Sequence, residues 1–353
     1  MDDPHGHLVC GCAYPSRRSL LGGLAGAAAV WPLAQGRATD SLAPRRVDVH
    51  HHFFPPVYLD SMAEVVGNKP SPLMTGWSAA GVLDHMDKTG VATAILSMSP
   101  WGPHFKDAAE ARDLARACNE YAAQTAHDHG GRFGLFAAMP LPDIDGALAE
   151  IAHALDTLKA DGVGLMTSYD GKWPGDPEFA PVFAELGRRK AVVYFHPNTP
   201  QCCASLVPDS TPAMLEWPYD TGRAVLSLLL SGALVKYPDI RWIFSHAGGP
   251  VPALAGRIVN MTRGRKDLAQ IAPQGVMHEL TRLHYDTANA YFAPTMAALL
   301  KFVPASQVLF GSDYPYFTLE QNVDGLAEIA LTQAERQAID RGNAARLMPR
   351  FAV

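Results

Sequence analysis

From about residue 46 to its end, the chain alternates short, almost continuously apolar runs with longer stretches in which apolar residues recur every three or four positions. An apolar run without polar alternation is typical of a parallel strand that is buried on both faces. Eight such runs predict strands, over residues 47–49, 91–98, 133–138, 163–167, 191–195, 241–245, 282–286 and 307–310.

Helices are predicted between these strands, where the apolar spacing fits one face of a helix. The clearest stretches are residues 107–128, 143–159, 178–189, 220–236 and 292–302. Strands that alternate with helices in this way indicate an α/β fold, a closed (β/α)₈ TIM-type barrel, as a catalytic domain over residues 46–353. An open doubly wound sheet is the alternative, but no glycine-rich phosphate loop follows the first strand. The irregular residues 197–218 are expected to form a lid or wall over the site.

The N-terminal residues differ from the rest of the chain. Arg17 and Arg18 precede an apolar stretch that is rich in alanine and glycine, and small residues follow it. This order is typical of a Tat export signal, and the apolar stretch is too short for stable membrane insertion. We therefore expect residues 1–36 to be a signal peptide, residues 37–45 to be a linker, and the protein to be periplasmic or exported. A disordered extension on a cytoplasmic protein is the alternative.

Composition narrows the classes of partner. The chain has 48% hydrophobic and 18% charged residues, which is an ordinary balance for a globular protein. Its formal net charge is −6 and no long basic run occurs, so nucleic acid is a poor candidate partner. The five cysteines form no CxxC pair and indicate no disulfide framework.

Titratable residues stand where several predicted strands end. His50 and His52 close the first strand, and because side chains alternate along a strand, they point to one side and the histidine between them to the other. His196 ends the fifth run, His246 follows the sixth, and Asp313 follows the eighth. Barrel active sites are built at the carboxyl ends of the strands, so these side chains are expected to converge. Imidazoles with one carboxylate suit Zn²⁺ or a similar divalent ion, with one position left open for water or substrate.

The same segments carry a family resemblance. The sequences VDVHHH (47–52), DPEFAPVF (176–183), HP (196–197), HAGG (246–249) and GSDYP (311–315) resemble motifs of the amidohydrolase superfamily. Within that superfamily, the chain resembles the aminocarboxymuconate semialdehyde decarboxylase family of metal-dependent decarboxylases. Residues 163–169 and 285–288 look most like those of 6-methylsalicylate and hydroxybenzoate decarboxylases.

The resemblance implies that His50, His52, His196 and Asp313 bind one divalent metal ion. His246 then acts as a general acid/base, and Asp313 or a metal-bound water supplies a proton with its assistance. Some aromatic-acid decarboxylases of this kind carry glutamate in place of the first histidine and prefer manganese. The histidine at position 50 therefore favours Zn²⁺, with Mn²⁺ as the alternative. The family usually forms homodimers.

Four further side chains are candidates for contact with the substrate. Arg257 corresponds under the resemblance to an arginine that grips a substrate carboxylate, sometimes in the neighbouring subunit's site. A surface arginine is an equal alternative. Trp101, Phe105 and Trp217 are expected to form an aromatic wall around a small aromatic acid.

Supporting roles are assigned to three other residues. Asp48 shares the inward parity of the first-strand ligands and is a candidate to orient one of them, with a structural hydrogen bond as the alternative. Asp286 ends the seventh strand and could orient a ligand in the same way, but a structural role is favoured for it. His284, on the same strand, is interpreted as a structural histidine with its hydrogen bonds satisfied.

Two enzymatic functions and one binding function are consistent with these residues. The favoured hypothesis is non-oxidative decarboxylation of a small hydroxybenzoate, which requires neither an organic cofactor nor oxygen. The alternative is a metal-dependent hydrolase, a lactonase or amidohydrolase that acts through a metal-activated water. A non-catalytic binding protein is less consistent, because every metal-ligand position is filled.

Overall fold

The computed structural model describes residues 45–352, except for residues 67–69, 101, 104–106 and 204–206. The predicted signal peptide over residues 1–36 and the predicted linker, up to residue 44, lie outside the described residues. In the part of the chain that is described, no helix is long and apolar enough to cross a membrane.

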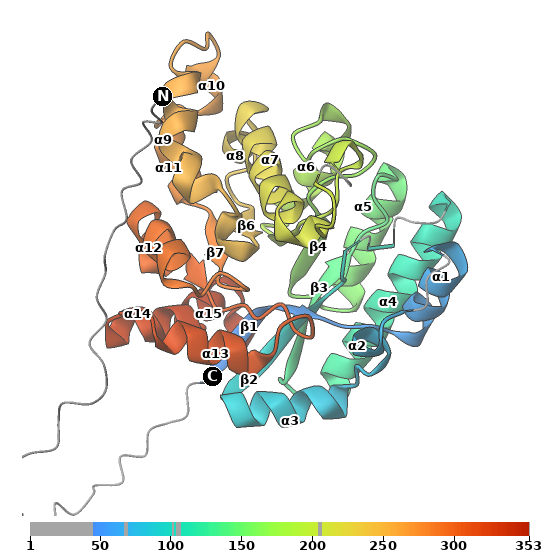
Figure 1. Cartoon of the computed structure of the whole chain (residues 1–353). Helices are drawn as coiled ribbons and strands as arrows, with labels where there is room; N and C mark the ends of the chain where they lie inside the picture. Colours follow the sequence, from blue (N-terminus) through green and yellow to red (C-terminus); the bar gives the residue numbers. More distant parts are fainter. Residues whose placement is uncertain (1–44, 67–69, 101, 104–106, 204–206, 353) are drawn as a thin grey trace, which may run out of the picture. The chain divides into compact units, whose positions relative to one another are not determined.

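Eight parallel strands pair in the order of the sequence and form a barrel (Figure 1). They are β1 (Arg46–His52), β2 (Val91–Ser97), β3 (Phe133–Ala138), β4 (Gly162–Met166), β5 (Val192–His196), β6 (Arg241–Phe244), β7 (His284–Asp286) and β8 (Val308–Leu309). The last strand returns to the first, since the Val49 N–H donates to the Phe310 carbonyl at 3.0 Å. The predicted α/β fold, a (β/α)₈ TIM-type barrel, is confirmed.

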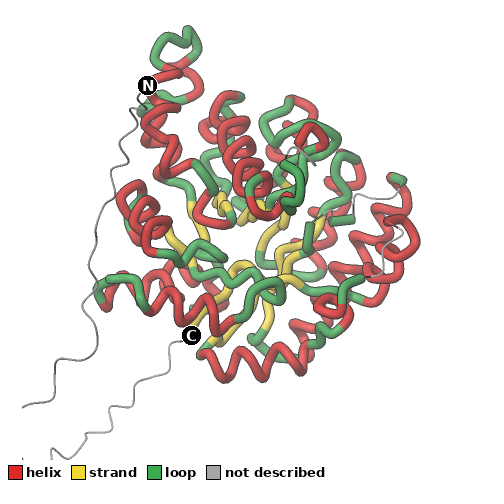
Figure 2. Tube along the Cα trace, viewed as in Figure 1, coloured by secondary structure: helices red, strands yellow, loops and turns green. Residues whose placement is uncertain are grey.

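The helices surround the strands, as Figure 2 shows by its red segments around the yellow ones. They are α1 (Pro56–Val66), α2 (Pro72–Thr75), α3 (Ala79–Thr89), α4 (Ala108–Asp128), α5 (Ile144–Ala152), α6 (Ala180–Arg188), α7 (Glu216–Leu230), α8 (Ala233–Lys236), α9 (Val251–Thr262), α10 (Leu268–Ile271), α11 (Val276–Thr281), α12 (Ala293–Phe302), α13 (Leu319–Ala327), α14 (Gln333–Gln337) and α15 (Asn343–Leu347). All five predicted helical stretches contain one or two of these helices.

Several predicted elements differ in their bounds from the observed ones, and two of the differences have identifiable reasons. β8 is shorter than predicted, because the Phe310 N–H donates to the Ile339 carbonyl at 3.0 Å rather than to a neighbouring strand. The helix predicted over residues 220–236 begins earlier, at Glu216, and is divided at Gly232. Gly232 has a φ of 75°, a left-handed conformation that glycine adopts without a steric penalty and that ends a helix.

The core has two parts, one outside and one inside the barrel. The larger part lies between the strands and the surrounding helices. The smaller part combines residues at alternate positions of the strands with residues of α15 and the segment after it. The strand residues are Val47, Val49, Ile95, Phe136, Val192, Tyr194, Ile243 and Leu309, and the others are Ala344, Leu347, Met348 and Phe351. These apolar side chains pack beneath the strand ends that carry the titratable residues, so the candidate site lies on top of a packed layer of the core.

His284 makes the stability of the barrel depend on pH. Burial lowers the pKa of His284 to about 4, whereas an unfolded chain binds the same proton near the ordinary value of 6.5. The unfolded state therefore gains a proton that the folded state does not take up as the pH falls from 6.5 towards 4. Between these two pH values, we expect the free energy of unfolding of the wild type to fall by about 2–3 kcal/mol more than that of His284→Gln, which has no such group to protonate.

Urea unfolding at several pH values measures this effect. His127→Gln is the control, because the His127 side chain is 82% exposed. If the free energy of unfolding depends on pH equally in the wild type and in His284→Gln, the prediction is wrong. His284 was interpreted as a structural histidine with its hydrogen bonds satisfied, but its buried Nδ1 has no hydrogen-bond partner among the described residues.

Candidate metal centre

Four donor side chains meet at the carboxyl ends of three strands. His50 and His52 close β1, His196 closes β5, and Asp313 follows β8. One ligand atom from each side chain lies within 4.8 Å of those of the other three, and all four residues are buried. The structure therefore brings together the four residues that were predicted to bind a metal.

The backbone of β1 separates its three consecutive histidines. His51 turns away from His50 and His52, and its ring stacks on Tyr314 with 4.8 Å between the ring centroids. Its Nδ1 lies 3.0 Å from the carboxylate of Asp48. Asp48 therefore orients His51, and the suggestion that it orients the ring of His50 or His52 is wrong.

The β8–β1 seam, the set of backbone hydrogen bonds between residues 49–52 and 310–314, fixes the position of Asp313. The Asp313 N–H donates to the His50 carbonyl at 2.8 Å, and the His52 N–H donates to the Tyr314 carbonyl at 2.8 Å. One carboxylate oxygen of Asp313 then lies 3.2 Å from His50 Nε2 and 3.1 Å from His52 Nε2. The bonds that close the barrel thus also set the distance between three of the donors.

Asp286 holds the ring of His50 and the backbone of His246. One carboxylate oxygen lies 2.9 Å from His50 Nδ1, and the other accepts from the His246 N–H at 2.8 Å. A carboxylate on Nδ1 fixes the tautomer of a histidine that binds metal through Nε2. A structural role was favoured for Asp286, with the orientation of a ligand as the alternative, and the observed contact with His50 fits the alternative.

The charges at the site favour a cation among the four donors. Burial alone would lower the pKa of His50, but Asp286 and Asp313 outweigh it and raise that pKa to about 10. Burial also opposes ionisation of Asp313, yet His50 and a hydrogen bond from His52 hold the pKa of Asp313 well below its usual value. In the absence of a metal, a proton on His50 therefore supplies the positive charge that the two carboxylates stabilise.

His196 also has the features of a ligand for a divalent metal ion. Its Nδ1 lies 2.9 Å from the Pro197 carbonyl, which leaves Nε2 as the free donor. Nε2 is buried and has no hydrogen-bond partner among the described residues. Burial, together with the neighbouring His52 and His50, lowers the pKa of His196 well below its usual value, so its ring is neutral and can coordinate a metal.

His246 lies beside the donor set and outside it. The distance between ring centroids is 4.9 Å to His50 and 5.7 Å to His196. Its Nδ1 lies 2.9 Å from the Ala288 carbonyl and therefore carries a proton, which leaves Nε2 to exchange protons with a bound molecule. This position suits the predicted role of general acid/base.

A cavity of about 700 Å³ opens beside His246 and Asp313. Its other lining residues are Thr211, Pro212, Ala213, Met214, Trp217, Pro218, Gly249, Asn289, Ala290, Thr295, Tyr316 and Phe317. Residues 211–218 therefore form part of its wall, as expected for the irregular segment after β5. Trp217 lines the cavity as predicted, and its Nε1–H donates to the Thr199 hydroxyl at 2.7 Å.

Of the other predicted substrate contacts, the one that the structure describes lies away from this cavity. Arg257 is exposed on α9 and lines a separate groove of about 340 Å³ between α7 and α9. Trp101 and Phe105 lie outside the described residues. Tyr316, whose ring centroid is 5.6 Å from that of His52, was not predicted from the sequence, because it follows a non-strand segment with no periodic signal.

We expect Asp286→Asn to weaken metal binding about 10–100-fold, since the amide removes a negative charge and a fixed acceptor at His50 Nδ1. Titration of metal-free protein with Zn²⁺ in the presence of a competing chelator measures the change. Asp324→Asn, on the exposed surface of α13, is the control. An unchanged affinity in Asp286→Asn would show that the contact does not orient His50 for coordination.

The chain is similar to known proteins along nearly the whole barrel. A family model described as amidohydrolase matches residues 47–350. The chain is 34% identical over 316 residues to a 6-methylsalicylic acid decarboxylase of Penicillium expansum, an alignment that covers 87% of this chain and 97% of that one. It is 37% identical over 289 residues to a 6-methylsalicylic acid decarboxylase of Aspergillus aculeatus, which covers 76% and 84% of the two chains. The crystal structure of an amidohydrolase II superposes with a TM-score of 0.79 at 28% identity, covering 86% of this chain and 99% of that one.

Proposed function

The chain belongs to the amidohydrolase family, and from this premise we propose that it is a metal-dependent, non-oxidative decarboxylase of a small hydroxybenzoate such as 6-methylsalicylate. One observation carries the proposal. A buried set of three histidines and one aspartate stands at the mouth of a cavity. The similarity to a 6-methylsalicylic acid decarboxylase, which covers 97% of that protein, supports the same reaction class, a carboxy-lyase.

His50, His52, His196 and Asp313 are the residues that would hold the metal ion. Three imidazoles and one carboxylate favour Zn²⁺, and Mn²⁺ is the alternative. When bound, the metal supplies a Lewis acid that positions the carboxylate and the neighbouring hydroxyl of the substrate.

The residues around the cavity then have to move one proton. The ring carbon that bears the carboxylate accepts a proton, the bond between that carbon and the carboxylate breaks, and its electron pair restores the aromatic ring as CO₂ leaves. Asp313, which is a carboxylate in the resting site, first takes up a proton from solvent through the cavity and then delivers it to the ring carbon. His246 assists this transfer, because both side chains line the cavity. No electrons leave the substrate, so neither oxygen nor an organic cofactor is consumed.

CO₂ release from a panel of hydroxybenzoates, with protein loaded with Zn²⁺ or Mn²⁺, tests the proposal. Release from at least one 2-hydroxybenzoate by the fully metallated protein is expected. If every member of the panel is inert while a lactone or amide is hydrolysed, the protein is instead a metal-dependent hydrolase that acts through an activated water.

Arg257 fits the proposal only through a second copy of the chain, so we propose a homodimer in which Arg257 contacts the substrate carboxylate of the neighbouring subunit. We expect Arg257→Ala to raise KM at least about 10-fold with little change in kcat, because a hydrogen bond to a charged group is lost. Arg263→Ala, also exposed at the end of α9, is the control. A monomer in analytical ultracentrifugation, or a normal KM in Arg257→Ala, would contradict this arrangement.

We propose in addition that residues 1–36 direct export through the Tat route. The support is the twin arginine at Arg17 and Arg18 ahead of an apolar stretch. A fusion of residues 1–45 to a folded reporter should be exported in a Tat-dependent manner, and the double Arg→Lys variant should stay inside the cell. Reporter that stays inside with both arginines intact would assign the protein to the cytoplasm.

A further inference from the structure

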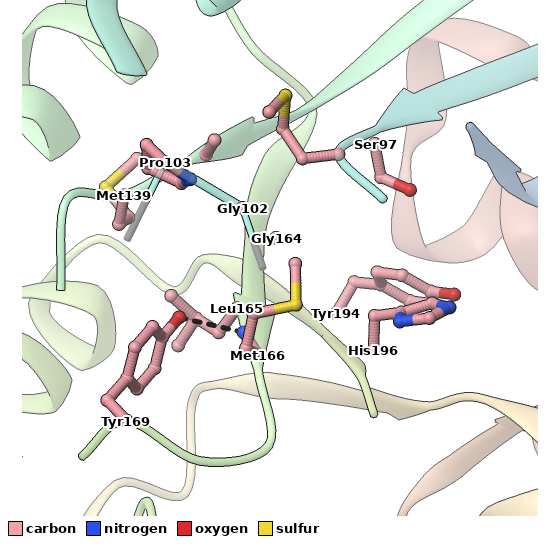
Figure 3. A pocket seen from close by; sticks show the side chains of 12 residues that line it. Ser97, Gly102, Pro103, Met139, Gly164, Leu165, Met166, Tyr169, Tyr194 and His196 are labelled. Carbon is pink, nitrogen blue, oxygen red and sulfur yellow. Dashed lines mark hydrogen bonds between the residues drawn. The ribbon is translucent and has the colours of Figure 1, made fainter. Parts of the chain in front are cut away.

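A second, much smaller cavity begins at the ring of His196, on the side of the metal centre formed by β2, β3, β4 and β5. Its free volume is about 10 Å³, about the space for one water molecule or one methyl group. Figure 3 shows the polar atoms of Ser97, Tyr194 and His196 at one end of it, with Met139 and Pro103 at the other. Because His196 is a metal ligand in the proposed site, the polar end is the end nearest the metal.

The far end of the cavity is apolar as far as the described residues that line it are concerned. Three methionines line the cavity: Met98, Met139 and Met166. In Figure 3 the sulfur of Met166 points into the middle of the cavity. The hydroxyl of Tyr169 is occupied, since it accepts from the Met166 N–H at 2.8 Å. A water molecule at this end would lack the two to four polar partners that hold a buried water.

The walls limit the size of the group that can enter. Ala138, Gly164 and Gly102 supply small or absent side chains around the cavity. A Cβ built on Gly164 would lie 3.3 Å from the Phe136 carbonyl oxygen, and one built on Gly102 would lie 3.5 Å from the terminal methyl of Met166. A single carbon atom added at either glycine would therefore already contact the atoms around it.

We propose that this cavity receives a small apolar substituent at ring position 6 of the substrate, and so selects 2-hydroxybenzoates that carry a methyl group there. The inference rests on the proposed decarboxylation. In a 2-hydroxybenzoate whose carboxylate and hydroxyl would be held by the metal donors, position 6 is ortho to the carboxylate on the side away from the hydroxyl. A methyl group at that position can enter from the His196 end and bury itself among the three thioethers.

Two measurements on the metal-loaded wild-type protein test the selectivity. We expect kcat/KM for 2-hydroxy-6-methylbenzoate to exceed that for 2-hydroxybenzoate at least about 10-fold, and that for 2,6-dihydroxybenzoate to be the lowest. The products give a readout without turnover: 3-methylphenol should bind about 4-fold more tightly than phenol by calorimetry. A preference for the 6-hydroxyl group, or equal binding of the two phenols, overturns the proposal.

Two variants change the cavity in opposite directions. Ala138→Val should fill it and remove the preference for the methyl group, while 2-hydroxybenzoate is still decarboxylated. Met166→Ala should enlarge it and raise kcat/KM for 2-hydroxy-6-ethylbenzoate at least about 10-fold relative to the wild type. Met62→Ala is the matched control, because Met62 and Met166 are both 5% exposed and Met62 does not line the cavity.

The outcomes separate this proposal from the proposed function. If no hydroxybenzoate releases CO₂, decarboxylation fails, while the binding of the two phenols still tests the cavity. If CO₂ is released but both cavity variants keep the wild-type ratios, the cavity does not hold the substituent. If a thermal unfolding assay shows that Ala138→Val does not fold, the result for Met166→Ala alone tests the proposal. If Met62→Ala raises kcat/KM for 2-hydroxy-6-ethylbenzoate as much as Met166→Ala does, the proposal is overturned.

Discussion

Replacement of His246 by asparagine should lower kcat for decarboxylation by about 10²–10⁴-fold, which is the usual contribution of a positioned general acid or base. The metal should remain bound, because His246 lies beside the four donors and is not one of them. Its ring is close enough to act on a molecule at the centre, with 4.9 Å between its centroid and that of His50. The Ala288 carbonyl at Nδ1 keeps Nε2 available for proton transfer.

The measurement is single-turnover CO₂ release together with metal analysis of the same sample. His127→Asn serves as the control, since its side chain is 82% exposed. Normal kcat with a full complement of metal would remove His246 from the mechanism.

Replacement of Asp313 by alanine should have a larger effect, because it removes both a ligand and a proton donor. We expect metal affinity to fall by more than about 100-fold, beyond the loss expected for a residue that only orients a ligand. The loss also leaves the histidines without the carboxylate that lies 3.1 Å from His52 Nε2 and 3.2 Å from His50 Nε2. CO₂ release should fall below detection.

Asp313→Asn separates the two roles. The amide keeps the size of the side chain and one oxygen donor but cannot deliver a proton. A variant that binds metal weakly yet remains inactive at saturating metal would assign proton transfer to Asp313. Recovery of activity at saturating metal would instead leave Asp313 as a ligand only, with His246 as the proton donor. Asp324→Ala, exposed on α13, controls for the loss of a carboxylate elsewhere.

The metal donors could be predicted because each stands at the end of an apolar strand, and alternation along the strand fixes its direction. Parity placed His50 and His52 on one side of β1, and the structure agrees. The partners of those ligands could not be predicted in the same way. The contact of Asp286 with His50 joins β7 to β1, and the distance of 2.9 Å depends on strand stagger around the barrel. Parity alone also misassigned Asp48, whose carboxylate contacts His51.

The substrate contacts were harder to predict than the ligands because they come from segments without periodicity. Trp217 was identified as an aromatic residue in an irregular segment, and it lines the cavity. Tyr316 and Asn289 line the same cavity but follow strand ends without any composition signal. Arg257 was placed on the correct helix, yet its side chain lies at a different groove from the one that contains His246.

The β8–β1 seam has a consequence for the order in which the protein is made. Its hydrogen bonds join residues near position 50 to residues near position 313, and the same residues carry three of the four donors. A chain still on the ribosome holds both β1 histidines long before Asp313 has been synthesised. The four donors therefore come together only when β8 pairs with β1. A bound metal ion indicates that this pairing has formed. A molecule that retains metal after gel filtration has therefore closed its barrel, and this can be measured independently of any substrate.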